Sequence, residues 1–172
     1  SKQEVISTVK LNKILSFDEQ TGLLNCESGI TLEKIIKDFL PSGWFPYVVP
    51  GTKKLTIGGM IAANIHGKNH HKVGGMVNFV EEITLFDGQK LLKCSRKNKS
   101  DLFFSTFGGM GLTGLIVNCK IRLNNIKTTK IISKNIPTKG IHDMLNKLRK
   151  NSESEFIVGW MDLVNRDLRG II

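Results

Sequence analysis

The sequence predicts an α+β fold, in which a largely antiparallel sheet is flanked by a few helices. Two apolar stretches, residues 80–86 and 90–94, flank Asp87-Gly88, a dipeptide typical of tight hairpin turns. Residues 32–39 instead carry apolar side chains at helical spacing. With 172 residues, of which 40% are hydrophobic, the chain is long enough to bury a substantial core.

Apolar runs bounded by turn signals predict the strands. The first two are expected on either side of a turn at residues 17–22, and the longest follows a glycine-rich loop. The expected strands are residues 5–14, 23–27, 47–49, 80–86, 90–94, 115–123, 128–135 and 156–163.

Helix starts are indicated by side chains that can accept from the free backbone N–H groups of a first turn. Thr31 is expected to cap a helix over residues 32–39 that ends before Pro41. Thr56 is expected to cap a helix that runs to Asn64. Two further helices are predicted, one at residues 100–104 with Ser100 as its cap and one at residues 140–150.

Residues 50–75 combine glycines with three of the four histidines of the chain. Adjacent Gly58 and Gly59 near a helix start each cost about 1 kcal/mol relative to alanine, so the bare backbone must bring a gain, such as the close approach of a ligand or of another backbone. A second glycine-rich loop covers residues 107–114. A single glycine is more often explained by a turn or by packing, but two such loops in one small domain favour a ligand.

The sequence lacks the motifs of several common nucleotide-binding, hydrolytic and zinc-binding sites. The glycines form no GxGxxG fingerprint between a strand and a helix, and neither a GxxxxGK[ST] loop nor a GxSxG nucleophile is present. His66, His70 and His71 do not have the HExxH spacing of a zinc site, and no carboxylate lies within their segment. His66 could bond to a cofactor or be a core histidine satisfied by backbone, and the residues alone leave both open.

The cysteine spacing and the net charge indicate which kinds of site and partner the protein can have. Cys26, Cys94 and Cys119 are far apart and form no CxxC pair, which indicates buried thiols rather than a zinc site or a disulfide framework. A net charge of +10 would suit nucleic acid, an anionic membrane surface or a phosphorylated ligand. The lysines are scattered in ones and twos rather than gathered along one helix or interleaved with aromatic residues, so we expect no nucleic-acid partner. No apolar run reaches the length of a membrane span, and a cytoplasmic location is expected.

Three motifs carry a family resemblance. They are residues 50–59, which contain PGT and TIGG, residues 64–71, NIHGKNHH, and residues 108–116, GGMGLTGLI. Together they resemble the FAD-binding PCMH-type domain of vanillyl-alcohol oxidase and p-cresol methylhydroxylase-type flavoproteins, most closely the decaprenylphosphoryl-ribose 2-oxidase branch. The resemblance covers about the middle half of the chain, and it implies FAD as the cofactor.

The resemblance also implies a set of site residues. His66 is the candidate catalytic residue at the isoalloxazine and substrate side, Lys68 and Asn69 are candidate substrate contacts, and no metal is expected. The backbone N–H groups of residues 56–59 are expected to face polar parts of the cofactor, because a helix start favours anions. The expected cofactor-binding residues are Gly51, Thr52, Thr56, Ile57, Gly58, Gly59, Ala63, Asn64, Ile65, His66, Gly67, Gly111 and Ile116.

The function implied by the resemblance is an FAD-linked oxidoreductase that acts on a CH–OH donor, a sugar or a polyprenyl-phosphate-sugar, with hydride transfer to the flavin. It also implies an epimerising short-chain reductase as a partner and association with the inner face of a bacterial membrane. An aldonolactone oxidase of the same superfamily is the enzymatic alternative. A non-catalytic basic module that binds anionic polymers or membrane surfaces is the alternative from another class.

The expected domain division is residues 1–135 as the C-terminal subdomain of the FAD-binding domain and residues 136–172 as the start of a substrate or cap domain. Both ends of the sequence look cut, which suggests a fragment. Relatives carry a glycine- and serine-rich loop for the FAD pyrophosphate upstream of the first strand here, and this sequence has no such loop. The chain alone is therefore expected to bind FAD weakly or not at all and to be inactive.

Overall fold

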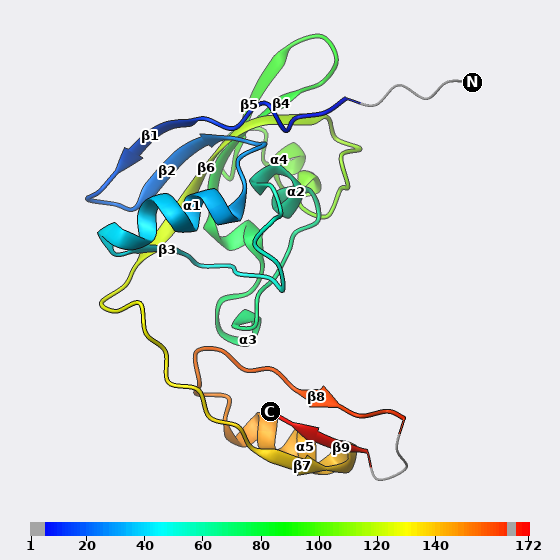
Figure 1. Cartoon of the computed structure of the whole chain (residues 1–172). Helices are drawn as coiled ribbons and strands as arrows, with labels where there is room; N and C mark the ends of the chain where they lie inside the picture. Colours follow the sequence, from blue (N-terminus) through cyan, green and yellow to red (C-terminus); the bar gives the residue numbers. More distant parts are fainter. Residues whose placement is uncertain (1–5, 165–167) are drawn as a thin grey trace.

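A computed structural model describes residues 6–164 and 168–172, which form a larger part and a smaller part joined by one connector (Figure 1). The larger part is built on a six-stranded sheet in the order β1-β2-β6-β4-β5, with β3 paired to the far end of β6. All of these pairings are antiparallel. The strands are β1 (Ile14–Asp18), β2 (Leu23–Glu27), β3 (Trp44–Pro46), β4 (Val80–Phe86), β5 (Leu91–Ser95) and β6 (Leu115–Asn125).

Short helices lie against this sheet, as Figure 1 shows for α1, α2 and α4. The α-helices are α1 (Leu32–Phe39), α2 (Ile57–Ala62), α3 (His70–Val73) and α4 (Ser100–Thr106), with 3-10 turns η1 (Leu40–Ser42) and η2 (Met76–Phe79). Thr31 Oγ1 accepts from the N–H of Lys34 at 3.2 Å, and Thr56 Oγ1 accepts from the N–H of Gly59 at 3.2 Å. Both predicted N-caps are therefore confirmed.

The core lies between the sheet and the helices. Ile35 of α1 and Ile61 of α2 pack with Leu24 and Ile83 of the sheet, and all four side chains are fully buried. This burial follows from the apolar spacing along α1 and from the alternation of β2, in which every second residue is buried. The core fixes α2, and with it the glycine-rich stretch, against the sheet.

The smaller part is a three-stranded antiparallel sheet in the order β7-β9-β8 with one helix packed on it. Its elements are β7 (Pro137–Lys139), α5 (Gly140–Lys150), β8 (Trp160–Met161) and β9 (Arg169–Ile171). Met144 of α5 is 8% exposed, and a Cβ on Gly170 would lie 2.5 Å from its Cε atom. The methionine therefore packs directly on bare backbone of the sheet.

The α+β prediction is confirmed, as are the hairpin of β4 and β5 and the long strand β6, while several boundaries were wrong. The first strand starts only at Ile14, and Val5 lies outside the described residues. β3 precedes the predicted strand at 47–49, residues 128–135 form no strand, and only Trp160–Met161 of 156–163 are in one. Lys99, in a left-handed conformation, rather than Ser100 stands at the cap of α4. An apolar run alone does not supply the neighbouring strand that a ladder requires.

Candidate functional site

The two glycine-rich segments meet beside the start of β6. The N–H of Met110 donates to the carbonyl of Ala62 at 3.0 Å, which joins the loop before β6 to the end of α2. The backbone of Ser28 links α2 to β6, because its carbonyl accepts from the N–H of Gly58 at 2.8 Å and its N–H donates to the carbonyl of Val117 at 2.9 Å. The two glycine-rich segments, far apart in the sequence, therefore lie side by side.

The glycines of the site divide into two groups. A Cβ on Gly58 would lie 2.8 Å from the Cβ of Ser28, and one on Gly67 would lie 3.0 Å from the backbone nitrogen of Val49. These two glycines therefore allow the chain to pack against itself.

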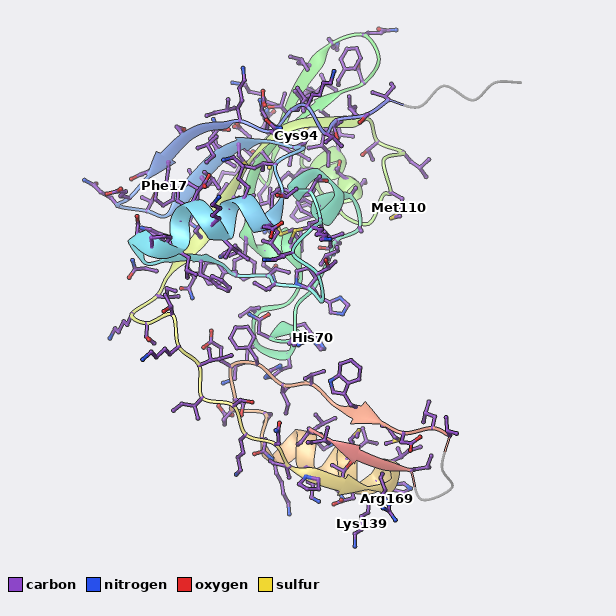
Figure 2. The ribbon with its side chains drawn as sticks, viewed as in Figure 1. Phe17, His70, Cys94, Met110, Lys139 and Arg169 are labelled. Atoms are coloured by element: carbon purple, nitrogen blue, oxygen red, sulfur yellow. The ribbon has the colours of Figure 1, made fainter. Side chains whose placement is uncertain are left out.

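The second group faces outward. A Cβ on Gly51 or on Gly111 would meet no atom within 4 Å, and Gly59 and Ala63 are exposed as well. Met110, which Figure 2 shows at the outer edge of the larger part, is 73% exposed on the same loop as Gly111. The surface where the segments meet thus presents bare backbone at Gly51, Gly59 and Gly111 beside the exposed side chain of Met110.

The start of α2 does not offer the free N–H groups that were expected. Those of Ile57, Gly58 and Gly59 donate to the Ile30 carbonyl at 2.9 Å, the Ser28 carbonyl at 2.8 Å and the Thr56 hydroxyl at 3.2 Å. The prediction that these groups face a ligand is therefore wrong, since all three are already used within the protein.

Other predicted cofactor-binding residues lie in the core or make hydrogen bonds within the protein. The side chains of Ile57 and Ile116 are 1% and 7% exposed and belong to the core. Asn64 adopts a positive φ of 43°, and its Oδ1 atom accepts from the N–H of Val77 at 3.1 Å. Ile65 is half-buried, and its carbonyl accepts from Met76 at 2.8 Å. Thr52 is exposed, and its hydroxyl accepts from the N–H of Lys54 at 3.3 Å.

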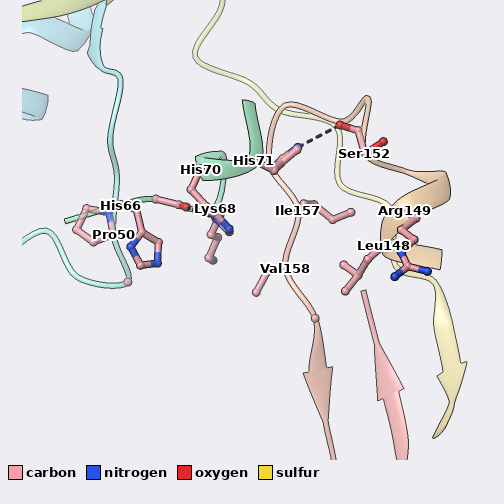
Figure 3. Close-up of a pocket in the computed structure, with 13 residues that line it drawn as sticks. Pro50, His66, Lys68, His70, His71, Leu148, Arg149, Ser152, Ile157 and Val158 are labelled. Atoms are coloured by element: carbon pink, nitrogen blue, oxygen red, sulfur yellow. Dashed lines mark hydrogen bonds between the residues drawn. The ribbon is translucent and has the colours of Figure 1, made fainter. Parts of the chain in front are cut away.

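A pocket of about 600 Å³ lies between the larger and the smaller part (Figure 3). Figure 3 shows His66 and Lys68 on one side of it and Leu148 and Arg149 on the other. Of the predicted site residues, the pocket collects Gly51, His66, Gly67 and Lys68. Its remaining lining residues are Pro50, His70, His71, Leu148, Arg149, Ser152, Ile157, Val158 and Gly159.

Two histidines are oriented by backbone carbonyls. His70 Nδ1 lies 3.1 Å from the carbonyl of Gly67, so this nitrogen carries the proton. His71 Nε2 lies 3.1 Å and 3.0 Å from the carbonyls of Ser152 and Ser154, so it donates to both. The imidazole of His66 is exposed and makes an edge contact with that of His70, with ring centroids 5.1 Å apart. His71 thus connects the two parts, while His66 faces the open pocket.

Further contacts hold the smaller part beside the pocket. The N–H of Ile157 donates to the Lys68 carbonyl at 3.0 Å. The ammonium group of Lys72 lies 3.5 Å from the carboxylate of Glu153 and also donates to the backbone carbonyl of that residue. Figure 2 shows His70 on the side of the larger part that faces the smaller part. The pocket therefore depends on contacts between residues about 80 positions apart.

Asn69 occupies a different environment from Lys68. It is 3% exposed, and its Nδ2 atom donates to the carbonyl of Tyr47 at 2.8 Å. Its Oδ1 atom is buried without a partner among the described residues. Asn69 anchors the segment that carries Lys68 and does not line the pocket of His66.

Comparison with known proteins agrees with this site. Residues 1–95 match the family of the FAD binding domain. The chain belongs to this family. It is an FAD-binding domain of the PCMH type, and FAD is its cofactor.

Three relatives show the range of this FAD-binding family. The chain is 33% identical to decaprenylphosphoryl-beta-D-ribose oxidase of Mycolicibacterium smegmatis, over 94% of the chain and 36% of that protein. It is 26% identical to the human Delta(24)-sterol reductase, over 88% of the chain and 30% of the relative. It is 27% identical to D-lactate dehydrogenase of Anaerostipes hadrus, over 82% and 31%. The chain thus spans about a third of the length of these relatives.

The residues present fit the flavin. A flat ring system requires close approach to backbone, which the outward-facing Gly51, Gly59 and Gly111 allow. A phosphate or an anionic ring requires a cation, and Lys68 lies in the adjacent pocket. The FAD-binding domain therefore offers exposed glycine backbone for the flat ring system and the ammonium group of Lys68 for an anionic group.

Metal binding and thiol chemistry would depend on the remaining titratable side chains of the described residues. These residues contain no group of three metal-ligating side chains. The Sγ atoms of Cys26 and Cys119 lie 4.0 Å apart on paired strands, and this contact, together with burial, raises the pKa of the Cys119 thiol well above its usual range. The Cys119 thiol is therefore a protonated core group. Within the same residues, no helix has the length and apolar character to cross a membrane.

The sequence did not predict the residues of the smaller part that line the pocket opposite His66. Leu148, Arg149, Ser152, Ile157 and Val158 belong to no motif, and they follow the histidines by roughly 80 residues. The sequence offers no signal that could have found them, because their position depends on how the smaller part docks on α3.

Proposed function

We propose that the whole protein is an FAD-dependent oxidoreductase that oxidises a CH–OH group of a sugar or of a sugar carried on a polyprenyl phosphate, by hydride transfer to the flavin. The relative that shares 33% identity is named a ribose oxidase, which supports a sugar-type substrate. The observation that carries the proposal is the pocket of about 600 Å³ in which the bare backbone of Gly51 meets the side chains of His66 and Lys68.

The chain contributes to this reaction in two regions. Residues 1–135 form the flavin wall, and residues 136–172 begin the domain that covers the substrate. The change from the six-stranded sheet to the separate sheet of β7, β8 and β9 supports this division, as does the position of the pocket between them. Bound FAD supplies the hydride acceptor.

His66 and Lys68 take distinct roles in the proposal. The imidazole of His66 is exposed to the pocket, where it can accept the proton of a substrate hydroxyl as the C–H bond is broken. The ammonium group of Lys68 has no carboxylate within 4.0 Å among the described residues, so it is available to an anionic group of the substrate or cofactor. Leu148 and Val158 exclude water from the opposite side.

The test uses His66→Ala in the whole protein. Flavin reduction by a short-chain prenylphosphoryl ribose is followed anaerobically by the loss of flavin absorbance. Removing a general base should lower the rate by about 10² or more. His142→Ala, which alters an exposed histidine on α5, is the matched control. Equal rates in both variants would contradict the role of His66, and faster reduction by an aldonolactone would favour an aldonolactone oxidase.

The flavin wall is tested separately with Gly51→Val. The new side chain has open space, so the fold should tolerate it, but it would occupy the surface that approaches the cofactor. We expect FAD to bind at least about tenfold more weakly, with Gln20→Val on the far turn as the control. Unchanged flavin content after dialysis would show that Gly51 does not touch the cofactor.

We also propose a cytoplasmic protein that works at the inner face of a bacterial membrane, with an epimerising short-chain reductase acting on its product. The net charge of +10 supports contact with anionic lipid. Salt-dependent binding to an anionic polymer without any flavin effect would instead favour a non-catalytic basic module.

A further inference from the structure

A hollow of about 620 Å³ lies between the connector (residues 126–136) and the segment that leads into β8. Residues 130–136 line one side of it and residues 154–158 the other, and Ile172 lines it as well. In Figure 1 the C-terminal end of β9 lies between β7 and the segment that leads into β8. The function proposed above makes no use of this hollow.

The central strand of the smaller sheet ends where the hollow begins. Ile171 of β9 pairs with Pro137 of β7 and with Trp160 of β8. Beyond this point Ile172 and Ile136 exchange both of their backbone hydrogen bonds, at 2.9 and 3.0 Å. The chain that precedes β7 and the chain that precedes β8 therefore flank a space in line with β9.

The connector offers unused backbone on its side of the hollow. In an antiparallel ladder every second residue directs its N–H and carbonyl groups toward the same neighbour. Counted back from Ile136, these residues are Lys134 and Ile132, and neither makes a backbone–backbone hydrogen bond in the described ranges 6–164 and 168–172. The side chains of Ile131 and Ile132 are 81% and 102% exposed, although β-branched residues favour strands. The connector therefore has the composition of a strand without the neighbour that a strand requires.

The segment before β8 shows the same alternation. The N–H of Asp162 donates to the carbonyl of the first residue of β9 at 2.8 Å. Every second residue before Asp162 should thus face the line of β9, and these include Val158 and Phe156, whose backbone has no backbone partner among the described residues. Ile157 lies between them, and its N–H donates in another direction, to the Lys68 carbonyl at 3.0 Å. Both sides of the hollow are therefore in phase with a missing central strand.

We propose that the residues that follow Ile172 in the whole protein continue β9 through this hollow, as a strand paired with both of its sides. Continued without a shift, the register of β9 fixes the partners. The first and third positions after Ile172 bond to the backbone of Val158 and Phe156. The second and fourth bond to that of Lys134 and Ile132.

The chain's own continuation fits the hollow better than another chain does. Ile172 already lines the hollow, so the continuation enters it in line with β9 and needs no loop. A strand of another molecule would first have to displace that continuation. Sequence for such a strand is expected in the whole protein, since the chain covers 36% of the ribose oxidase.

The strand also has a role at the reaction pocket, and this role rests on the proposed function. Lys68, Ile157 and Val158 line both the pocket of His66 and the hollow, so the two spaces meet at these residues. The first position after Ile172 lies against Val158. A strand there closes the pocket on the side of Lys68 and excludes water from the reaction.

Pairs of introduced cysteines test the register in the whole protein. Ser133→Cys and a cysteine at the third position after Ile172 form a non-hydrogen-bonded pair, with Cα atoms about 4.5 Å apart and within reach of a disulfide. We expect an intramolecular disulfide after mild oxidation. The native cysteines are buried and do not compete.

A shift of one residue supplies the control for the disulfide. With Ser133→Cys and a cysteine at the fourth position after Ile172, the two side chains point to opposite faces, so no disulfide should form. Equal yields in the two pairs, or no disulfide in either, overturn the proposal. A disulfide between two molecules also overturns it, because the hollow then belongs to a second copy.

Two proline variants test the hydrogen bonds of the same strand. Lys134→Pro removes an N–H that is directed into the hollow, whereas Ser133→Pro removes one that is directed away from it. In the whole protein, Lys134→Pro should lower the unfolding temperature by about 2 °C or more relative to Ser133→Pro. In the 172-residue chain, which lacks the strand, the two variants should unfold at similar temperatures. Equal effects in the whole protein overturn the proposal.

Hydrogen exchange provides a measurement that needs no variant. The amides of Lys134 and Val158 should exchange at least about tenfold more slowly in the whole protein than in the 172-residue chain, while that of Ile157 is protected in both. Equal exchange of Lys134 and Val158 in the two proteins overturns the strand. A strand that is confirmed by the disulfide, in a protein whose flavin is not reduced by prenylphosphoryl ribose, would contradict only the proposed function and the role at the pocket.

Discussion

The two parts of the molecule are stabilised in different ways. In the larger part, β2, β4 and β6 of the sheet and two helices share a core of fully buried side chains. In the described ranges of the smaller part, 136–164 and 168–172, Met144 is the one hydrophobic side chain that is buried. Hydrogen bonds from His71 and Lys72 hold this part beside the pocket. One side of the pocket is therefore rigid, and the other depends on a few polar contacts.

This difference suits a site that must both hold a cofactor and admit a substrate. The glycine-rich surface formed by α2 and the loop before β6, which lies outside the His66 pocket, keeps its shape because Ile61 and Ile83 pack behind it. The opposite wall, with Leu148 and Val158, belongs to a part that buries little apolar surface. We therefore expect the smaller part to open at a lower free energy than the larger part.

The largest effect is expected from Ile83→Ala, in the centre of the larger core. Deleting a fully buried branched side chain should lower the free energy of unfolding by about 2–5 kcal/mol, measured by chemical denaturation. Leu91→Ala, at a position that is 61% exposed on β5, is the control. A loss as small as that of the control would mean that the larger part does not have the core described above.

Met144→Ala tests the independence of the smaller part. The loss of its packing on Gly159 and Gly170 should cost about 2 kcal/mol, toward the low end of the range for buried methionines because the residue is the only core side chain described there. Hydrogen exchange should accelerate across residues 137–161 and remain unchanged in β4 and β6. Acceleration in both sheets would show that the two parts unfold together.

His71→Ala acts on the contact between the parts. The variant removes a donor shared by the carbonyls of Ser152 and Ser154, which should cost about 1 kcal/mol. Exchange should increase at residues 152–157, with His142→Ala as the control. If protection of this segment is the same in both variants, His71 does not hold the smaller part.

The smallest expected effect is the contribution of the Asp143 carboxylate to folding stability, which changes only at acidic pH. The hydrogen bond from the Lys147 ammonium, and then that from the N–H of Lys139, lower the pKa of Asp143 below its usual value of 3.8. Because the folded-state pKa is lowered, the carboxylate contributes stability above its unfolded pKa and loses it as the pH falls through the folded value.

The acid effect is measured with Asp143→Asn, with Asp101→Asn as the control. The stability difference between wild type and Asp143→Asn, followed by thermal unfolding, should shrink between about pH 6 and about pH 3. A difference that is the same at both ends of this range would assign the effect to helix capping without charge.

The larger part was predictable from the sequence to the extent that local physics decides it. Thr31 and Thr56 cap helices because their hydroxyls accept N–H groups within the same turn. The Asp87-Gly88 turn specifies the pairing of β4 with β5. The contact between the two glycine-rich segments came from the structure, because neither segment by itself indicates the other.

By itself, then, the sequence determined the threonine caps of α1 and α2, the hairpin, the amphipathic helices and the family to which the chain belongs. The tertiary structure alone decided that Gly58 packs on Ser28 while Gly51 faces outward, and that Val158 lies across a pocket from His66. It also left residues 128–135 without a partner strand, although their composition favours one. The physical reason is that caps and turns depend on neighbours in the chain, whereas pockets and ladders depend on segments brought together by burial of a shared core.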